Sequence, residues 1–397
     1  MNLFFISEAR FVYGQDGKVY YVDKSFGPDL WRRYLNVFNH IYVIARIAPA
    51  SEQIQTQNMC CAELENVSFI PMPYGVGFRE LIKNLPASVR LLKEILLPGN
   101  AYICRVPGFW GTLSAFILKS RKIPYGVEVV GDPWDLFAPN PFNVFKFRRL
   151  IRITSFLLLK LTVKYAHAAI YVTKSALQKR YPASNAIFST YASNVFLPPE
   201  AFSQPALKNR IETFSILTIG SLAQMYKAPD IAIAISKILK SQNIKFHWTW
   251  IGAGKYLEEM QQLATQENVS DVIEFIGGIA NAPELRKYLF SADLFVLPSR
   301  TEGLPRAMIE AMAAGLACVG TNVGGIKELI SEEWLTAPDK PQEMAQRIIS
   351  FIQDCELLFN AASINFNEAQ DYKISLIQQR RNDFQKALVS CVINCPK

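Results

Sequence analysis

Residues 302–315 read EGLPRAMIEAMAAG, and this stretch contains a turn, the start of a helix and two acids. Pro305 suits the first turn of a helix, where its missing N–H costs nothing. The residues after it are mostly strong helix formers, and Gly315 stands where a glycine often ends a helix. We therefore predict a helix between Pro305 and Gly315. Glu302 then lies on the loop before this helix, and Glu310 about one and a half turns inside it.

The segments on either side of this helix have the pattern of buried strands. Residues 293–299 form a short apolar run that ends in Pro and Ser, and Ala317-Cys318-Val319-Gly320 follows the helix. Strand, loop, helix and strand make one βαβ unit. Ligands of open parallel sheets bind beyond the carboxyl ends of the strands, where Glu302 falls. Backbone N–H groups at the start of the helix favour an anion there, especially a phosphate.

Three stretches together resemble the retaining glycosyltransferases of family 4, which have the GT-B fold. The first is residues 302–315 with the downstream Gly324-Gly325-Ile326-Lys327-Glu328, which resembles the donor-site motif of that family. The second is Gly220-Ser221-Leu222 followed by Lys227, which resembles the family's glycine turn and phosphate-binding lysine. The third is residues 127–135 in the N-terminal half. The resemblance is tight over about residues 215–330 and loose elsewhere.

The resemblance implies a role for each matching residue. Glu310 would accept hydrogen bonds from the ribose hydroxyls of the nucleotide, as carboxylates do with diols. Glu302 would lie near the donor sugar or its leaving phosphate, and Lys227 would neutralise the diphosphate as it leaves. The remaining donor-binding candidates are Gly220, Ser221, Gly303, Leu304, Pro305, Gly324, Gly325 and Gly14. Each role has an alternative. Glu310 could be a solvated acid on a helix, Glu302 an ordinary loop acid and Lys227 a surface lysine. The glycines could simply form turns.

The chain departs from the family pattern at several positions. Ser221 stands where members often carry Arg, and Ala228 stands where they often carry Gly. Either Lys227 and backbone N–H groups suffice, or another basic residue such as Arg306 compensates. Many members have His near Asp132, which here could receive the acceptor proton, orient the donor sugar, or simply form a turn before a proline. None of the three His matches a catalytic motif.

Length and composition favour two domains with full hydrophobic cores. The chain has 397 residues, of which 50% are hydrophobic and 19% are charged. Apolar runs alternate with helical stretches, which predicts two Rossmann-like α/β domains over residues 1–200 and 210–370. A proline-rich linker, Ala192–Asn209, lies between them. The resemblance to GT-B proteins implies that the two domains face each other across a cleft. It also implies that a last helix, residues 375–397, packs back on the first domain. Short apolar runs predict strands at 41–44, 67–70, 101–105, 125–130, 168–172, 214–219, 247–251, 272–275, 294–297 and 317–319.

The net positive charge of the chain lies in its N-terminal half. Residues 1–200 hold 23 Lys and Arg against 13 Asp and Glu, and the rest of the chain holds 19 against 21. This predicts an anionic acceptor or surface, and no nucleic-acid-binding module is evident. Residues 142–163 are basic and rich in aromatic and aliphatic side chains, so they either lie on an anionic membrane or form a core helix with one wet face.

Several kinds of site or location are not indicated by the sequence. No cluster of acids or histidines has metal-ligand spacing, so we expect no metal and no cofactor, the nucleotide sugar being a substrate. The seven scattered Cys favour reduced thiols, and neither a signal peptide nor a membrane span is evident. We therefore expect a cytoplasmic location, peripheral on the inner face of the membrane if residues 142–163 bind it.

The function expected from these features is metal-independent transfer of a hexose, with retention, from a nucleotide sugar to a hydroxyl acceptor. The acceptor would be a glycan or a lipid-linked molecule, in the synthesis of a bacterial polysaccharide or glycolipid. Two alternatives stay open: a nucleotide-sugar epimerase or phosphorylase on the same fold, and a non-catalytic GT-B binding subunit.

Overall fold

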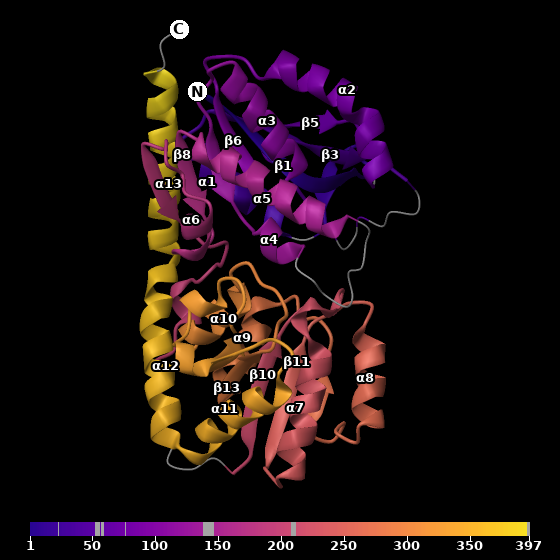
Figure 1. The fold of residues 1–397 in the computed structure, drawn as a ribbon, viewed down its shortest axis with the longest axis vertical. Coiled ribbons are helices and arrows are strands. Elements are labelled where there is room, and N and C mark those ends of the chain that lie inside the picture. The colour runs from indigo at the N-terminus through magenta and orange to yellow at the C-terminus, as the bar shows by residue number, and fades with distance from the viewer. Residues whose placement is uncertain are drawn as a thin grey trace. The chain divides into compact units, whose positions relative to one another are not determined.

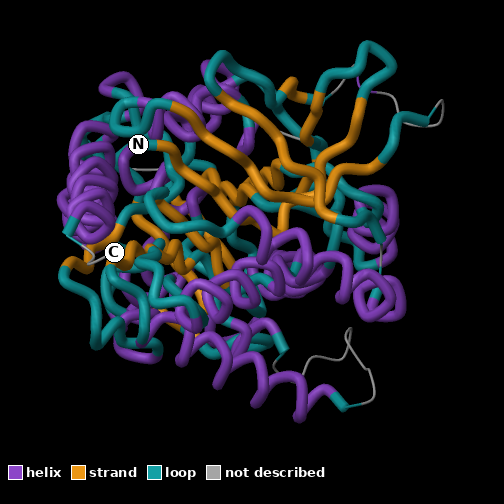
Figure 2. Tube along the Cα trace, turned by 90° about the horizontal axis from the view of Figure 1, so that it is seen from above, coloured by secondary structure: helices purple, strands orange, loops and turns teal. Residues whose placement is uncertain are grey.

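The computed structural model describes residues 1–397 except 23, 52–55, 57–58, 76, 138–146, 208–211 and 395–397, and the side chains of 24 and 78. The described chain divides into two compact units. Unit 1 contains the described residues up to Ala192 and those from Gln378 onward, and unit 2 contains Ser193–Ile377. The elements are labelled in Figure 1, and Figure 2 shows strands gathered in layers with helices packed against them.

Unit 1 is an α/β domain with a mostly parallel sheet. Its strands are β1 (Asn2–Tyr13), β2 (Val19–Tyr21), β3 (His40–Ala48), β4 (Cys60–Cys61), β5 (Val67–Met72), β6 (Ala101–Val106), β7 (Gly126–Val129), β8 (Ala168–Tyr171) and β9 (Phe188–Tyr191). Its helices are α1 (Pro28–Leu35), α2 (Phe78–Ile95), α3 (Phe109–Ser120), α4 (Pro133–Leu136), α5 (Arg148–Lys164), α6 (Ala176–Arg180) and most of α13 (Ile374–Ile393).

The parallel strands of unit 1 run in the order β5-β3-β1-β6-β7-β8-β9. Short antiparallel strands extend one corner, where β2 pairs with β1 and β4 pairs with β2. Successive strands therefore build outward first on one side of β1 and then on the other. The reversal lies between β1 and β6, and it is the point at which open α/β sheets usually bind ligands.

The C-terminal helix completes the core of unit 1. Phe384 and Leu388 of α13 are buried, and their side chains lie against Gly126 at the start of β7. A Cβ at position 126 would meet the Phe384 ring at 3.0 Å. Gln385 donates a hydrogen bond to the Arg33 carbonyl on α1 at 3.3 Å. The first domain is thus built from both ends of the chain.

Unit 2 is a second α/β domain with an entirely parallel sheet. Its strands are β10 (Phe214–Ile219), β11 (Phe246–Ile251), β12 (Ile273–Phe275), β13 (Leu294–Leu297), β14 (Ala317–Thr321) and β15 (Leu335–Thr336). Its helices are α7 (Pro229–Ser241), α8 (Leu257–Gln266), α9 (Ala282–Ser291), α10 (Arg306–Ala313), α11 (Pro341–Gln353) and α12 (Cys355–Ala369). The strand order is β12-β11-β10-β13-β14-β15, the order of a Rossmann sheet, with its reversal between β10 and β13.

The apolar runs in the sequence predicted β3, β5 to β8 and β10 to β14, and the structure confirms these strands. The short strands β2, β4, β9 and β15 were not predicted. The end of helix α10 is also as expected, because Gly315 has φ +83° and its N–H bonds the Met312 carbonyl while Leu316 N–H bonds that of Ala311. Its start differs by one residue, since Pro305 is the extended N-cap and Arg306 is the first helical residue.

In the part of the chain that the structure describes, we find no helix both long enough and apolar enough to cross a membrane.

Candidate functional site

The carboxyl ends of β10 and β13 bring the predicted donor-binding residues of unit 2 together. Lys227 lies on the connection that follows β10, and Glu302 lies on the loop that follows β13. These two strands are neighbours in the sheet, with Ile216 paired to Leu294, although almost 80 residues separate them along the chain. The pair therefore lies at the point where the strand order reverses, which is where Rossmann sheets bind nucleotides.

Lys227 and Glu302 contact each other directly. The Lys227 ammonium donates a hydrogen bond to Oε1 of Glu302, and only 11% and 7% of the two side chains are exposed. Ser299 Oγ donates to the same oxygen at 2.7 Å. The second carboxylate oxygen of Glu302 has no bond to the described residues, so it remains an acceptor for a ligand. A partly desolvated cation of this kind interacts strongly with any phosphate that reaches it.

Arg300 fixes the backbone that carries Lys227, and sequence reasoning missed it. Its guanidinium binds Asp230 at 2.6 and 3.0 Å and Asp339 at 2.8 Å, and it donates to the Met225 carbonyl at 2.9 Å. Its backbone N–H donates to the Tyr226 carbonyl at 2.7 Å. The signal in the sequence is a basic residue, Arg300, soon after a buried strand. Its partners become known only with the fold.

The two departures from the family pattern have different structural settings. Ala228 has φ +57° and is fully buried, so it adopts the left-handed conformation that glycine takes without strain. The glycine that the family resemblance led us to expect at this position would adopt it without strain. Ser221 is exposed, and its hydroxyl accepts a hydrogen bond from the Ala223 N–H at 3.2 Å. Arg306 is also exposed and opens helix α10.

The glycines around this site mainly let backbone pack on backbone. Gly324 has φ +50°, and a Cβ there would lie 1.8 Å from the Glu302 carbonyl oxygen. Gly325 donates to the Gly303 carbonyl at 2.6 Å. Gly252 is in equally close contact with Gly220: a Cβ at position 252 would lie 1.8 Å from the Gly220 carbonyl oxygen. The structure thus gives Gly324 and Gly325 a partner inside the protein, and their predicted contact with the donor stays a prediction.

Glu310 is the most perturbed acid of this region. It lies on α10 between the buried residues Ile309 and Ala311. Burial raises the pKa of Glu310 to about 7, and the charge of Arg306 lowers it only in part. Among the described residues, none hydrogen-bonds its carboxylate. A desolvated acid without a partner is a candidate for binding a ligand that supplies hydrogen-bond donors.

Asp132, predicted as a catalytic candidate, is held by three partners in unit 1. Its carboxylate accepts hydrogen bonds from the Trp134 N–H at 2.8 Å and the Tyr181 hydroxyl at 2.6 Å, and it forms an ion pair with Arg180. Arg180 also binds Asp135 at 2.9 Å. Asp132 is the N-cap of α4, which is the turn-forming alternative considered above. A role in proton transfer stays a prediction.

Gly14, predicted to contact the donor, lies in the tight hairpin between β1 and β2. Its N–H bonds the Lys18 carbonyl at 2.8 Å, and a Cβ would meet Asp16 at 2.6 Å and Tyr20 at 2.7 Å.

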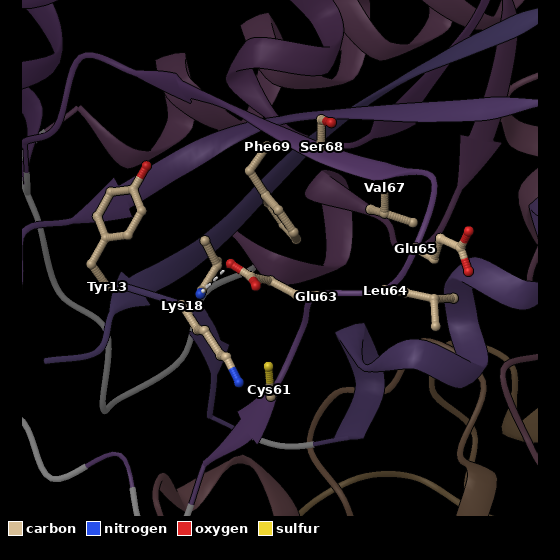
Figure 3. A pocket seen from close by; sticks show the side chains of 10 residues that line it. Tyr13, Lys18, Cys61, Glu63, Leu64, Glu65, Val67, Ser68 and Phe69 are labelled. Atoms are coloured by element: carbon tan, nitrogen blue, oxygen red, sulfur yellow. Dashed lines mark hydrogen bonds between the residues drawn. The ribbon is translucent and has the colours of Figure 1, made fainter. Parts of the chain in front are cut away.

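Residues beside this hairpin line a recess of about 650 Å³, shown in Figure 3. There Glu63 stands between Tyr13 and Glu65, and its carboxylate accepts the Val19 N–H at 3.0 Å. The recess therefore offers carboxylates, hydroxyls and an aromatic ring in one place.

The reversal point of the unit 1 sheet is occupied by the protein's own carboxylate. Glu8 of β1 binds Arg46 of β3 at 2.6 Å, and its other oxygen accepts the Trp110 N–H at 3.2 Å in the first turn of α3. Gly108 leaves room for this contact, because a Cβ there would lie 3.2 Å from that of Glu8. An acid thus already fills the place that an anionic ligand would take at this helix start.

No group of three or more His, Cys, Asp or Glu among the described residues is arranged to hold a metal ion.

Comparison with known proteins agrees with the geometry of unit 2. Residues 213–354 match the family model described as glycosyl transferases group 1. Unit 2 belongs to this family. The chain also resembles Protein CapJ of Staphylococcus aureus, with 26% identity over 374 residues that cover 93% of this chain and 91% of that protein. The putative colanic acid biosynthesis glycosyltransferase WcaL of Escherichia coli is 32% identical over 161 residues, covering 38% of this chain and 39% of WcaL.

Solved structures extend the likeness to both units of the chain. Sucrose-phosphate synthase from Thermosynechococcus elongatus superimposes with a TM-score of 0.69 at 16% identity, covering 98% of this chain and all of that one. Anabaena HepE in complex with UDP-glucose superimposes with a TM-score of 0.61 at 16% identity, covering 98% and 100%. At this level of identity the likeness concerns the fold. The two Rossmann-like units are those of the GT-B fold, as the sequence predicted.

Proposed function

We propose that this chain transfers a hexose, with retention of configuration and without a metal, from a nucleotide sugar to a hydroxyl acceptor. The names of the relatives favour bacterial polysaccharide or glycolipid synthesis as the setting, since WcaL is described as a colanic acid biosynthesis glycosyltransferase. HepE, of the same fold, was solved with UDP-glucose, which supports a nucleotide sugar as donor.

The observation that carries this proposal is the Lys227–Glu302 pair at the reversal point of the unit 2 sheet. A diphosphate needs a fixed cation and backbone N–H groups, and both Lys227 and the start of α10 lie at the carboxyl ends of the strands. Negative charge grows on the leaving diphosphate in the transition state. A preorganised ammonium there lowers the barrier more than it tightens ground-state binding.

Glu310 supplies the second part of the donor site. Its desolvated carboxylate takes two charge-assisted hydrogen bonds when a ribose diol is presented to it. The donor then provides the partners that the described residues do not. Retention without a protein nucleophile is consistent with front-face displacement, in which the leaving diphosphate itself accepts the proton of the attacking hydroxyl.

The acceptor is assigned to unit 1, which carries the excess of basic residues. Its recess beside the β1–β2 hairpin has the carboxylates, hydroxyls and aromatic ring that commonly bind saccharides. We assign the protein a cytoplasmic place, peripheral on the inner face of the membrane, through the basic stretch 142–163. Residues 142–146 of that stretch lie outside the described part, and α5 represents the rest.

The proposal is tested by donor binding and turnover in matched variants. Lys227→Ala and Glu310→Ala should each lower turnover of the donor at least tenfold, or about 1.4 kcal/mol of transition-state stabilisation, while the protein stays folded. Lys237→Ala is the control, because that ammonium also binds a carboxylate, Glu267 at 2.6 Å, but on the surface. A thermal-shift panel of nucleotide sugars identifies the donor, since ligands that bind only the folded form raise its Tm.

Other outcomes would replace the proposal. Wild-type turnover in both variants would remove Lys227 and Glu310 from the mechanism. An altered free or nucleotide-bound sugar, formed without an acceptor, would indicate an epimerase or phosphorylase. A wild-type protein that neither hydrolyses nor transfers any donor would be a binding subunit. Lost turnover after removal of divalent ions by a chelator would contradict metal independence.

A further inference from the structure

Helix α5 carries an apolar stripe on its solvent-exposed side. Seven positions on one side of the helix define it, and six of them are large hydrophobic side chains with exposed fractions between 42% and 74%. These are Phe147, which precedes the helix, and Leu150, Ile153, Leu157, Leu158 and Leu161. The opposite side of α5 packs on unit 1 through the buried Leu159 and Val163. A helix is normally polar on the side that faces water, and α5 is not.

The one polar residue within the stripe turns its hydroxyl away from the surface. Thr154 Oγ1 bonds the carbonyl of Leu150 at 2.8 Å and that of Ile151 at 3.1 Å. Its methyl group is thus left among the apolar side chains. The stripe extends from residue 147 to residue 161, so it runs for about 21 Å. A contiguous apolar surface of this length on the exposed side of a helix marks a place that a membrane or another molecule covers.

Cations border the stripe, and acids are absent from it. Arg149, Lys160 and Lys164 are exposed and lie along one border, because 149 and 160 are separated by about three turns. Residues 147–167 contain no Asp or Glu. At the C-terminal end of α5, Lys119 and Lys122 line a recess of about 270 Å³ with Tyr165. Lys119 Nζ lies 3.1 Å above the centre of the Tyr165 ring.

Not every basic residue of α5 belongs to this border. Arg152 lies over the Trp134 ring, with its guanidinium carbon 3.8 Å from the ring centre, and its Nε donates to the Trp134 carbonyl at 2.6 Å. It therefore fixes α5 to the segment before it. The acids of that segment, Asp132 and Asp135, are both bonded to Arg180. The positive charge of the border is not cancelled from that side.

We propose that the stripe of α5 inserts into the interfacial layer of an anionic lipid membrane, with Arg149, Lys160 and Lys164 on the lipid phosphates. Helix α5 crosses the front of unit 1 in Figure 1. An interfacial helix is recognised by an apolar face with cations beside it, and it lies in the plane of the membrane. This inference rests on the proposed membrane association through residues 142–163, and it names the side chains that would contact the lipids. It makes apolar insertion, and not charge alone, the source of binding.

A second copy of the chain is a poorer occupant of the same surface. Two α5 helices packed stripe to stripe would bring their cationic borders close together, and like charges across an interface oppose binding. Anionic lipids supply the opposite charge and an apolar layer at once. Each cation near such a surface strengthens binding roughly fivefold at low salt, and the effect declines as salt screens it.

The first test is flotation of the full chain with vesicles of phosphatidylcholine and phosphatidylglycerol, three to one. Leu150→Gln/Leu157→Gln should reduce the bound fraction at least tenfold. Phe290→Gln/Ile364→Gln is the control, since those residues are 46% and 53% exposed on unit 2 and should leave binding within twofold. Both double variants should keep the wild-type Tm, because exposed side chains are exchanged. Equal flotation of the α5 variant and the wild type would overturn the proposal.

A second set of variants tests the charged border. Arg149→Gln/Lys160→Gln/Lys164→Gln should reduce binding at least tenfold on the anionic vesicles and by less than threefold on pure phosphatidylcholine. Lys245→Gln/Lys287→Gln/Lys340→Gln removes the same charge from exposed positions of unit 2 and should change neither. Loss of binding in both triple variants alike would show that net charge, and not this border, is responsible, which contradicts the proposal.

Insertion itself is measured with Leu158→Trp as a reporter, whose emission is the difference between the variant and the wild type, because the chain already contains six Trp. Its emission should shift to the blue on binding and be quenched by brominated acyl chains, whereas unquenched emission would overturn insertion. A dimer in lipid-free buffer that Leu150→Gln/Leu157→Gln abolishes would assign the stripe to a second copy instead. Turnover of the donor with a soluble acceptor should be unchanged in all α5 variants, so failure here is distinct from failure of the proposed transfer.

Discussion

The two units have the same strand order around their reversal points and fill those points differently. In unit 1, Glu8 binds Arg46 and also accepts a backbone N–H at the start of α3. In unit 2, Lys227 and Glu302 meet beside the start of α10, whose first turn contains no acid. Each point thus holds an acid–cation pair, but the acid of unit 1 also accepts a hydrogen bond from a helix start, whereas Glu302 of unit 2 binds Lys227 and Ser299. The comparison teaches that strand order alone does not make a nucleotide site.

The largest expected effect concerns how unit 2 holds its site loops. Gly324→Ala should lower the free energy of unfolding by at least about 4 kcal/mol, because the new Cβ meets the Glu302 carbonyl oxygen in a backbone of positive φ. Gly99→Ala is the matched control: Gly99 has φ +89° with open space around it, so only about 1 kcal/mol is expected. Denaturant unfolding measures both. A small loss at Gly324 would mean that the two loops are not held by this contact.

The second prediction separates the two reversal points directly. Glu8→Ala leaves the buried Arg46 without its carboxylate and should cost about 3 kcal/mol of stability. A nucleoside diphosphate should not restore it, because the Arg46 guanidinium stays bonded to the backbone carbonyls of Gly75 and residue 8. Glu302→Ala also leaves a cation unpaired, and in that variant the diphosphate should restore stability by binding Lys227. Equal rescue of both variants, followed by Tm, would abolish the distinction.

The smallest expected effect is the pH dependence caused by Glu310. Its folded-state pKa of about 7 lies above its ordinary value of 4.5, so the folded protein holds the proton more tightly than the unfolded chain. Its contribution to stability is fully present below pH 4.5 and is lost as pH rises through 7, by about 2 kcal/mol after allowing for partial exposure. Glu310→Gln should remove this part of the dependence.

Donor affinity should depend on pH in the opposite direction to stability, since the ribose hydroxyls donate to the ionised carboxylate of Glu310. Donor affinity is therefore expected to rise between pH 6 and 8 in the wild type and to be flat in Glu310→Gln. Donor affinity that falls over this range in the wild type would contradict the assigned role of Glu310. Unfolding curves at each pH, with and without donor, measure both quantities.

Local patterns in the sequence predicted the two α/β units and the loops that follow β10 and β13, whereas the GT-B fold was predicted from the family resemblance. Helix α10, its glycine end and the two flanking strands depend on residues within one βαβ unit, so propensity and spacing could predict them. The ion pair of Arg300 with Asp230 could not be predicted, because the two residues are 70 positions apart and meet only after the sheet forms. The same is true of Gly324 against Glu302.

Asp132 shows a different limit of sequence reasoning. A residue type and a position at a strand end are compatible with both catalysis and capping, and only its partners distinguish them. The structure supplies Arg180, Tyr181 and the Trp134 N–H as partners. The short strands β2 and β4 were missed for a related reason, since two or three residues carry no periodicity of their own.

Helix α13 has a consequence for the order in which the chain matures. The strands of unit 1 precede unit 2 in the sequence, yet Phe384 and Leu388, which are buried against β7, follow it. On the ribosome, the whole of unit 2 is made before this core has its final two side chains. The strands of unit 1 must therefore wait, incompletely packed, until α13 has been made.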